Sequence, residues 1–437
     1  MPRTMLITVL LSCASLSLGA QSFQFRMNQP AEAVADLEMS SPGSDWAEAG
    51  REAAVAAVSL DGSYRAHVTL YAGARRYHYP VFLGRVEAGE HRLEVARDPQ
   101  HSAAGSGLEV ASAGFREYRR GDPYFPVLAN APVLYARPDT MGRFSDVPLL
   151  CYSERLEEDG RPLLEYTMVY SNEDGGTSTR ALMARWGRTT DIDYVYKVYL
   201  DGRGRVRRAT IQGQDHKEIE SRGKREGTHP LLIVSTQNNM IAQEGRSAIR
   251  YQIAPIEAEL AEHSREQVMD DHPMTWRVMA QELRREGKLR PFGTLDEEKI
   301  SDPRNYLYLE AKVANQDSGL AVLIRRQGEE VWRSSNLGRM DYAISRSGWV
   351  RTAVELPPGS QGPDLAEIAF QCQVVRPEKA KWPRSGVCRI EAVSKSFFLG
   401  PDYTPGPNVW SLPAGSGALV IPSGEMRRFE ARRAAQK

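Results

Sequence analysis

The sequence lacks an excess of charge of either sign. Lysine and arginine together number 56, aspartate and glutamate together number 56, and the formal net charge of the 437 residues is zero. Nucleic acids and anionic membranes attract proteins through a strong basic field, so the balance argues against both as partners. With 41% hydrophobic and 26% charged residues, the composition is that of a soluble globular protein, and the length predicts about two to four domains.

Long hydrophobic runs are absent after the first twenty residues. Arg3 precedes the short apolar run "MLITVLLSCASLSL", and "LGA" ends at Ala20. This order is typical of a secretory signal peptide, and the run is too short for a convincing membrane span. We expect cleavage after residues 1–20, no transmembrane segment in the mature chain, and a secreted or periplasmic protein. Anchoring as a lipoprotein through Cys13 is the alternative.

Cysteine is scarce, and its placement supports an oxidising compartment. Besides Cys13 there are three, of which Cys372 and Cys388 fall on the apolar faces of two alternating strands, "AEIAFQCQVV" and "GVCRIEAV". A disulfide that closes a loop of about 15 residues stabilises a fold by roughly 3 kcal/mol in the chain-entropy model. We expect this disulfide, with two buried free thiols as the alternative. Cys151, in "VPLLCYSE", is expected to be a small core residue.

Several familiar catalytic motifs are missing. The chain has no Walker loop, no G-x-S-x-G elbow, no H-E-x-x-H and no paired C-x-x-C, which lowers the expectation of an NTPase, an α/β-hydrolase or a zincin. The missing motifs do not exclude an enzyme whose active site is assembled from residues on several separate strands.

Strand-like alternation dominates the chain. Residues 21–50 are polar and poorly patterned, but "AAVAAVSLDG", "YRAHVTLYAG", "YHYPVFLGRV" and "EHRLEVARD" follow in close succession with glycine-bearing turns. We expect a mainly β, multi-domain protein of antiparallel β-sandwiches. The expected parts are an immunoglobulin-like β-sandwich over 21–118, a central β-rich domain over 119–299 and a C-terminal β-sandwich over 300–437.

One segment of the central domain, near residues 255–288, has helical character. It is rich in helix formers, with Pro273 suited to a first turn and Gly287 to a stop. One apolar stripe, which we expect to pack, comprises Met274, Trp276, Val278, Met279 and Leu283. We expect the helices to cover part of the middle sheet or to link it to the segment that follows.

Residues 181–206, "ALMARWGRTTDIDYVYKVYLDGRGRV", hold the most informative polar pattern. An unbroken strand would place Ile192, Tyr194, Tyr196, Val198 and Leu200 on one face. If "DGRG" closes a hairpin with Lys197 opposite Arg208, one polar face gathers six residues: Asp191, Asp193, Gln212, Gln214, His216 and Glu218. An odd loop would slip the register and destroy this cluster.

Three interpretations of that face are open. It can be the solvated outer face of an antiparallel sheet, with no cofactor. It can bind a cation such as Ca²⁺ through carboxylate and amide oxygens, with the ligands Asn172, Asp174, Asp191 and Asp193. It can also be a hydrolytic site in which carboxylates and a histidine divide acid and base roles, with the catalytic candidates Asp191, Asp193, His216 and Glu218.

A candidate ligand-binding platform precedes this strand. Trp186 lies between Arg185 and Arg188. An indole can stack on a sugar while guanidinium groups bind its hydroxyls or carboxylates. The alternative is a tryptophan at a sheet edge with arginines that extend to water.

Residues 120–242 resemble a vacuolar protein sorting-associated family of β-rich proteins. The resemblance rests on "YFPVLANAPVLYARPD", "SDVPLL", "LLEYTMVYSNEDGG", "DIDYVYKVYLDGRG" and "GTHPLLIVSTQNN". The family places an aspartate before an amphipathic strand and tends to carry Trp-Glu-His after the following glycine, whereas Asp191 here is followed by Ile192-Asp193-Tyr194. The resemblance implies a β fold for this region rather than an activity.

These patterns favour a non-catalytic protein that binds an extracellular polymer or a protein partner. A secreted hydrolase of glycans, with its site in the central domain, is the alternative.

Overall fold

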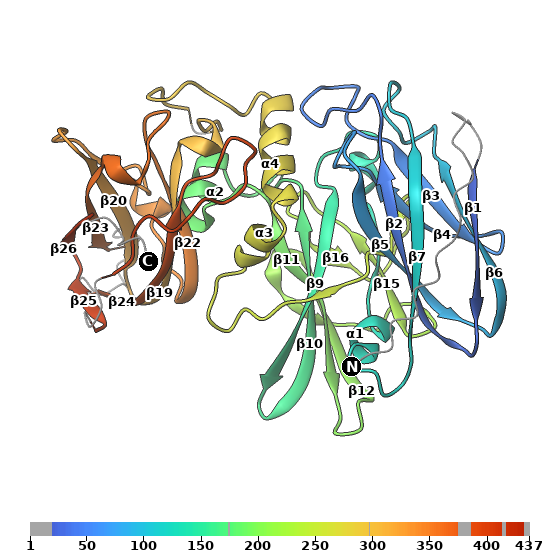
Figure 1. Cartoon of the computed structure of the whole chain (residues 1–437). Coiled ribbons are helices and arrows are strands. Elements are labelled where there is room, and N and C mark those ends of the chain that lie inside the picture. The colour runs from blue at the N-terminus through green and yellow to red at the C-terminus, as the bar shows by residue number, and fades with distance from the viewer. Residues whose placement is uncertain (1–19, 174, 297, 375–385, 413–416, 432–437) are drawn as a thin grey trace. The chain divides into compact units, whose positions relative to one another are not determined.

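The computed structural model describes residues 20–173, 175–296, 298–374, 386–412 and 417–431. The chain forms two compact units: unit 1 contains Met1–Asp174 and Asp191–Ala258, and unit 2 contains Gly175–Thr190 and Glu259–Lys437. Strands are far more extensive than helices (Figure 1), which confirms the mainly β class. Residues 1–19 of the expected signal peptide lie outside the described residues, Cys13 included. The three-part domain division stays a prediction.

Two antiparallel sheets in unit 1 come from residues 21–118. The first has the order β1-β6-β3-β4, with bounds Gln21–Met27, Gly89–Arg97, Val55–Leu60 and Ser63–Thr69. The second has the order β5-β2-β7, with bounds Tyr77–Val86, Ala31–Ser40 and Glu109–Tyr118. Phe25 of β1 stacks on Phe115 of β7, with ring centroids 4.1 Å apart. The sheets therefore pack as a sandwich.

The sequence expectation missed the first two strands. Residues 21–50 contain β1, whose burial alternates along the strand, and β2, whose burial does not. Strand β2 is central in its sheet, and most of its residues are buried, polar Glu32 and Ser40 among them. A strand that is covered on both faces has no exposed face to alternate with a buried one, so a two-residue period is lost.

Two further sheets complete unit 1. A six-stranded sheet has the order β13-β12-β11-β10-β9-β18, with bounds Glu218–Glu220, Val206–Gln212, Ile192–Leu200, Arg161–Tyr170, Pro148–Glu158 and Ile256–Glu257. The other contains β14, β15, β8 and β17, with β16 paired to β15, and bounds Arg225–Glu226, His229–Val234, Val133–Tyr135, Arg250–Tyr251 and Ile241–Ala242. Helix α1, Phe125–Ala129, adds to the core, where the cysteine Cys151 is fully buried and free, as expected.

The hairpin of β11 and β12 differs from the expected register. Lys197 lies opposite Thr210, and Arg208 lies opposite Tyr199 instead. The cause is the turn: the Asp201 carboxylate accepts hydrogen bonds from the backbone nitrogens of Arg203 and Arg205, each at 2.9 Å. This side chain closes a wider loop than we expected, and the pairing moves by two residues.

Strand β11 also contains a bulge that the sequence did not reveal. Tyr196 lies opposite Tyr166 and Tyr194 lies opposite Thr167, so that Val195 is an extra residue on β11. Both Val195 and Tyr196 are buried in the same core. A bulge inserts one extra residue into the strand. Side chains at even-numbered positions therefore point to one face before the bulge and to the other face after it. The single apolar face expected from Ile192 to Leu200 is therefore wrong.

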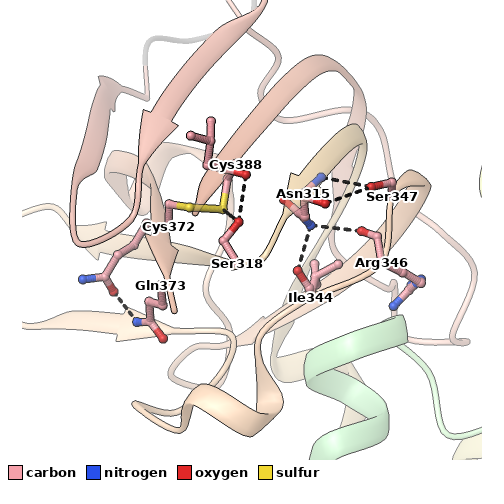
Figure 2. The surroundings of a disulfide bond; sticks show 10 residues. Asn315, Ser318, Ile344, Arg346, Ser347, Cys372, Gln373 and Cys388 are labelled. Carbon is pink, nitrogen blue, oxygen red and sulfur yellow. Dashed lines mark hydrogen bonds between the residues drawn. A yellow bond between two sulfur atoms is a disulfide. The ribbon is translucent and has the colours of Figure 1, made fainter. Parts of the chain in front are cut away.

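Unit 2 contains two antiparallel four-stranded sheets. One has the order β22-β19-β24-β25, with bounds Gly348–Glu355, Tyr306–Gln316, Val387–Phe397 and Leu419–Pro422. The other has the order β21-β20-β23-β26, with bounds Trp332–Ser334, Gly319–Arg326, Leu365–Gln373 and Met426–Glu430. Cys372 of β23 and Cys388 of β24 form a disulfide between the sheets, with Cα atoms 5.6 Å apart (Figure 2). The expected pairing is confirmed.

The helices of unit 2 partly follow the sequence expectation. Helices α3 and α4 span Gln267–Asp271 and Met274–Arg285, inside the expected segment, whereas Ile256–Glu257 at its start is a strand. Most of the expected stripe is buried, with Met274 half-buried.

Short 3₁₀ turns occur in both units, at Pro138–Thr140, Gln214–His216, Pro303–Asn305, Met340–Tyr342 and Gly362–Asp364. None of the described helices is long and apolar enough to cross a membrane.

Helix α2, Thr179–Trp186, was not expected. The Ser178 hydroxyl accepts a hydrogen bond from the Ala181 backbone nitrogen, which caps the first turn. Gly187 ends the helix in the left-handed conformation, at φ 62°, and a Cβ there would lie 3.2 Å from the Thr352 backbone of β22. Glycine therefore permits both the turn and the close contact. Trp186 lies on a helix and not at a sheet edge.

Candidate functional site

Asp191 and Asp193 flank the start of β11 in unit 1. Asp191 is 5% exposed, and its carboxylate accepts a hydrogen bond of 2.9 Å from the Asn239 side-chain nitrogen. Asp193 lies opposite Met168, on the face that joins the buried core. Burial raises the pKa of Tyr170, and the nearby charges of both aspartates add to this effect. Asp191 therefore lies in a buried polar environment, whereas Asp193 is half-buried.

His216 and Glu218 lie elsewhere on the same sheet. His216 is exposed in a 3₁₀ turn, and its ring nitrogens contact the side chains of Gln212 at 2.7 Å and Asn238 at 3.1 Å. Glu218 forms ion pairs with Arg208 at 3.1 Å and with Lys197 at 3.7 Å.

The four candidate catalytic residues do not form one cluster. On β10, Glu165 lies opposite Lys197 and Met168 lies opposite Asp193. Glu165 and Met168 are three residues apart. Residues three apart on a regular strand point to opposite faces. Glu218, as a partner of Lys197, is thus on the other face of the sheet from Asp193.

The four candidate calcium ligands are described only in part. Asn172 is 2% exposed and follows β10, whereas Asp174 lies outside the described residues. The geometry of the set with Asp191 and Asp193 is therefore incomplete, and calcium binding stays a prediction.

The platform residues Arg185 and Trp186 form the last turn of α2 in unit 2. The Thr352 hydroxyl of β22 donates a 2.6 Å hydrogen bond to the Ala184 carbonyl, which fixes this turn against the sheet. Both Arg185 and Trp186 are half-buried, and the Arg185 guanidinium carbon is 5.8 Å from the indole centroid. The Arg185 guanidinium donates to the Asp341 carbonyl, at 3.1 Å from Nε.

A third residue, Arg346, joins this platform and was missed by the sequence analysis. Its guanidinium carbon lies 5.2 Å from the centroid of the Trp186 ring. The Asn315 side-chain nitrogen donates to the carbonyls of Ile344 at 2.8 Å and of Arg346 at 3.0 Å (Figure 2), which positions the backbone before β22. Because 160 residues separate Arg346 from Trp186, no local pattern could have linked them.

Arg188 has a different environment from its two neighbours. It is buried, and its Nε atom forms an ion pair of 2.9 Å with the buried carboxylate of Glu266. Burial lowers the pKa of Arg346 to about 10; Glu266 opposes this change, whereas the charges of Arg188, Arg265 and Arg185 add to it. The charges of three neighbouring arginines thus act on Arg346, against that of Glu266.

A buried ionic network holds α3 to the sheet of unit 2. Arg351 is fully buried, and its guanidinium forms ion pairs of 2.8 Å with Asp270 and with Glu310. The Lys395 amino group lies 2.6 Å from Asp270. Burial alone would raise the pKa of Glu310, but the charge of Arg351 and a hydrogen bond from Ser264 help to lower it to about 2. The network therefore joins α3 to β19, β22 and β24.

A second polar cluster, in unit 1, was also missed. His67 and His101 are 7% and 8% exposed, and both contact the Asp98 carboxylate. Burial lowers the pKa of His67, with Asp98 opposing the change. Burial acts to raise the pKa of Asp98, but hydrogen bonds from His101 and the Gln100 backbone lower it. The D-x-x-H spacing of Asp98 and His101 was the available signal in the sequence.

Comparison with known proteins adds no family. No protein-family model matches the chain, and no curated protein matches it either. The resemblance of residues 120–242 to the vacuolar protein sorting-associated family therefore stays a prediction.

Proposed function

We propose that this is an exported, non-catalytic protein that binds an acidic extracellular polysaccharide through Arg185, Trp186 and Arg346. The observation that carries the proposal is the pair of guanidinium groups within 6 Å of one half-buried indole, at 5.2 and 5.8 Å from its centroid. An indole offers an apolar surface to a sugar ring. Each guanidinium offers planar donors that match a carboxylate or a sulfate.

Local charge favours an acidic polymer over a neutral one. The charges of Arg188, Arg265 and Arg185 act on Arg346, and only the charge of Glu266 opposes them there. The nearby carboxylate of Asp341 is bound by Arg339, at 2.9 and 3.2 Å. An anionic ligand would relieve the repulsion among the arginines, and its charge would be partly shielded from water by the half-buried indole.

Export is part of the proposal. The leader-like segment before Gln21 and the disulfide between Cys372 and Cys388 support it, because disulfides persist in oxidising compartments. Binding is favoured over glycan hydrolysis because Asp193 and Glu218 belong to opposite faces of their sheet.

Affinity electrophoresis tests the proposal with the full chain. We compare native gels that contain a carboxylated, a sulfated or a neutral polysaccharide. Trp186→Ala and Arg346→Ala should each weaken retardation by the acidic polymers by about tenfold or more, since tryptophan and arginine anchors contribute roughly 2 kcal/mol.

Trp332→Ala is the matched control. Trp332 is also half-buried and flanked by arginines, Arg325 at 5.9 Å and Arg428 at 5.4 Å, but Arg325 is ion-paired with Glu367. Equal losses in Trp186→Ala and Trp332→Ala, or equal retardation by neutral and acidic polymers, would reject the proposed site. Circular dichroism checks that each variant is folded.

A further inference from the structure

The strand order of the first sheet in unit 1 brings three metal-binding side chains to one place. His67 of β4 lies opposite Ala57 of β3, which lies opposite Ala96 of β6. Cα partners share a face, and the two alanine methyl groups leave room beside the imidazole. Asp98, two residues after Ala96, returns to the same face. The turn that follows carries His101.

The coordinating atoms of these residues converge. Asp98 Oδ2 lies 3.1 Å from His67 Nε2 and 2.6 Å from His101 Nδ1, and the three ligand atoms lie within 4.8 Å of one another. Asp98 Oδ1 accepts hydrogen bonds from the backbone nitrogens of Gln100 at 2.8 Å and His101 at 3.3 Å. These backbone bonds orient Oδ2 toward the two imidazoles.

The hydroxyl of Tyr64 contacts the other side of the His67 ring. Its Nδ1 atom lies 2.5 Å from the Tyr64 hydroxyl, which also accepts a hydrogen bond of 3.4 Å from the Arg250 backbone nitrogen. Histidines that bind metals usually pair their other ring nitrogen in this way. A tyrosine hydroxyl both donates and accepts hydrogen bonds, so Tyr64 can accept a hydrogen bond from Nδ1–H when Nε2 binds a metal.

We propose that His67, Asp98 and His101 form a binding site for a divalent transition metal of the zinc class. Two imidazoles and one carboxylate suit Zn²⁺, whereas Ca²⁺ and Mg²⁺ prefer oxygen ligands alone. Three protein ligands leave one coordination position for water. The metal ties β4 to the turn after β6, at one end of the N-terminal sandwich. The site is in unit 1 and independent of the polysaccharide platform in unit 2.

Zinc titration of the tag-free, EDTA-stripped full chain tests this site. We expect calorimetry to give one Zn²⁺ per chain, and the melting temperature to rise by about 5 °C when free Zn²⁺ is a hundredfold above its dissociation constant. His67→Ala and His101→Ala should each lower the affinity by about tenfold or more. His78→Ala is the matched control, because His78 forms an exposed pair with Asp36, at 3.2 Å, and this variant should bind Zn²⁺ like the wild type.

Co²⁺ provides a readout that needs no variant. Bound at this site in the wild type, it should show the visible absorption of a four- or five-coordinate ion, and added Zn²⁺ should abolish the signal. Less than a fifth of an equivalent of Zn²⁺ per chain, an octahedral Co²⁺ spectrum, or unchanged affinity in both ligand variants would overturn the proposal. The last outcome would show that Asp98 only bridges two histidines by hydrogen bonds.

Discussion

Lys197 and Asp193 lie on opposite faces of β11, although residues four apart on an unbroken strand would share a face. Lys197 lies opposite Glu165 and Asp193 lies opposite Met168, because Val195 forms a bulge between them. Bulges redirect side chains in this way. The shift moves Asp193 toward the core and leaves Lys197 with Glu165, at 3.1 Å.

A double-mutant cycle tests this arrangement. Glu165 is 6% exposed, so Lys197→Met should destabilise the chain by about 1–3 kcal/mol, because it leaves a buried carboxylate without its partner. Adding Glu165→Leu should recover part of this loss, whereas Asp193→Ala should combine additively with Lys197→Met. Urea unfolding measures the free energies. Coupling between Lys197 and Asp193 instead of Glu165 would contradict the bulge.

The disulfide between Cys372 and Cys388 should stabilise the protein measurably. The two residues are separated by 16 positions, and the entropy model gives about 3 kcal/mol for a loop of this size. The Cys372→Ala/Cys388→Ala variant should unfold at a lower urea concentration than the wild type. A reducing agent should shift the wild type but leave the variant unchanged. Thiol titration of the denatured chain from Gln21 onward should find one free thiol, Cys151; three would disprove the bridge.

Stability should depend on pH through Glu310. Its pKa in the folded protein is about 2, against an ordinary 4.5. Between these values the unfolded chain takes up a proton that the folded chain does not, so stability is complete above pH 4.5 and falls as the pH drops toward 2. Glu310→Gln should lower stability at pH 7 but flatten this acid limb. Glu391 is exposed on β24 of the same sheet. Glu391→Gln should therefore leave the loss of stability at acid pH unchanged.

Local patterns in the sequence predicted strands, turns and the disulfide, because these depend on neighbouring residues. The alternation around Cys372 and Cys388 indicated two strands whose inner faces meet. Local patterns failed for β2, which is covered on both faces, and for the bulge at Val195, which depends on its pairing with β10. Helix α2 is brief, and its end at Gly187 is decided by contact with β22.

The candidate site was partly visible in the sequence. Arg185 and Trp186 were recognised because they are adjacent, but Arg346 reaches the same indole from a distant segment. The hydrolytic set from Asp191 to Glu218 depended on a register and on an unbroken strand, and both assumptions were wrong. His67 and Asp98 come together through strand order, which the sequence did not specify.

The central claim is that the arginine–tryptophan platform binds an acidic polysaccharide, and calorimetric titration tests it most directly. One sulfated polysaccharide is titrated into the wild type and into Arg346→Gln, at low salt and at high salt. We predict saturable binding that weakens with salt, as screened charges require, and an affinity about tenfold lower in Arg346→Gln. Equal affinity of the two proteins, or no binding by the wild type at low salt, would contradict the account.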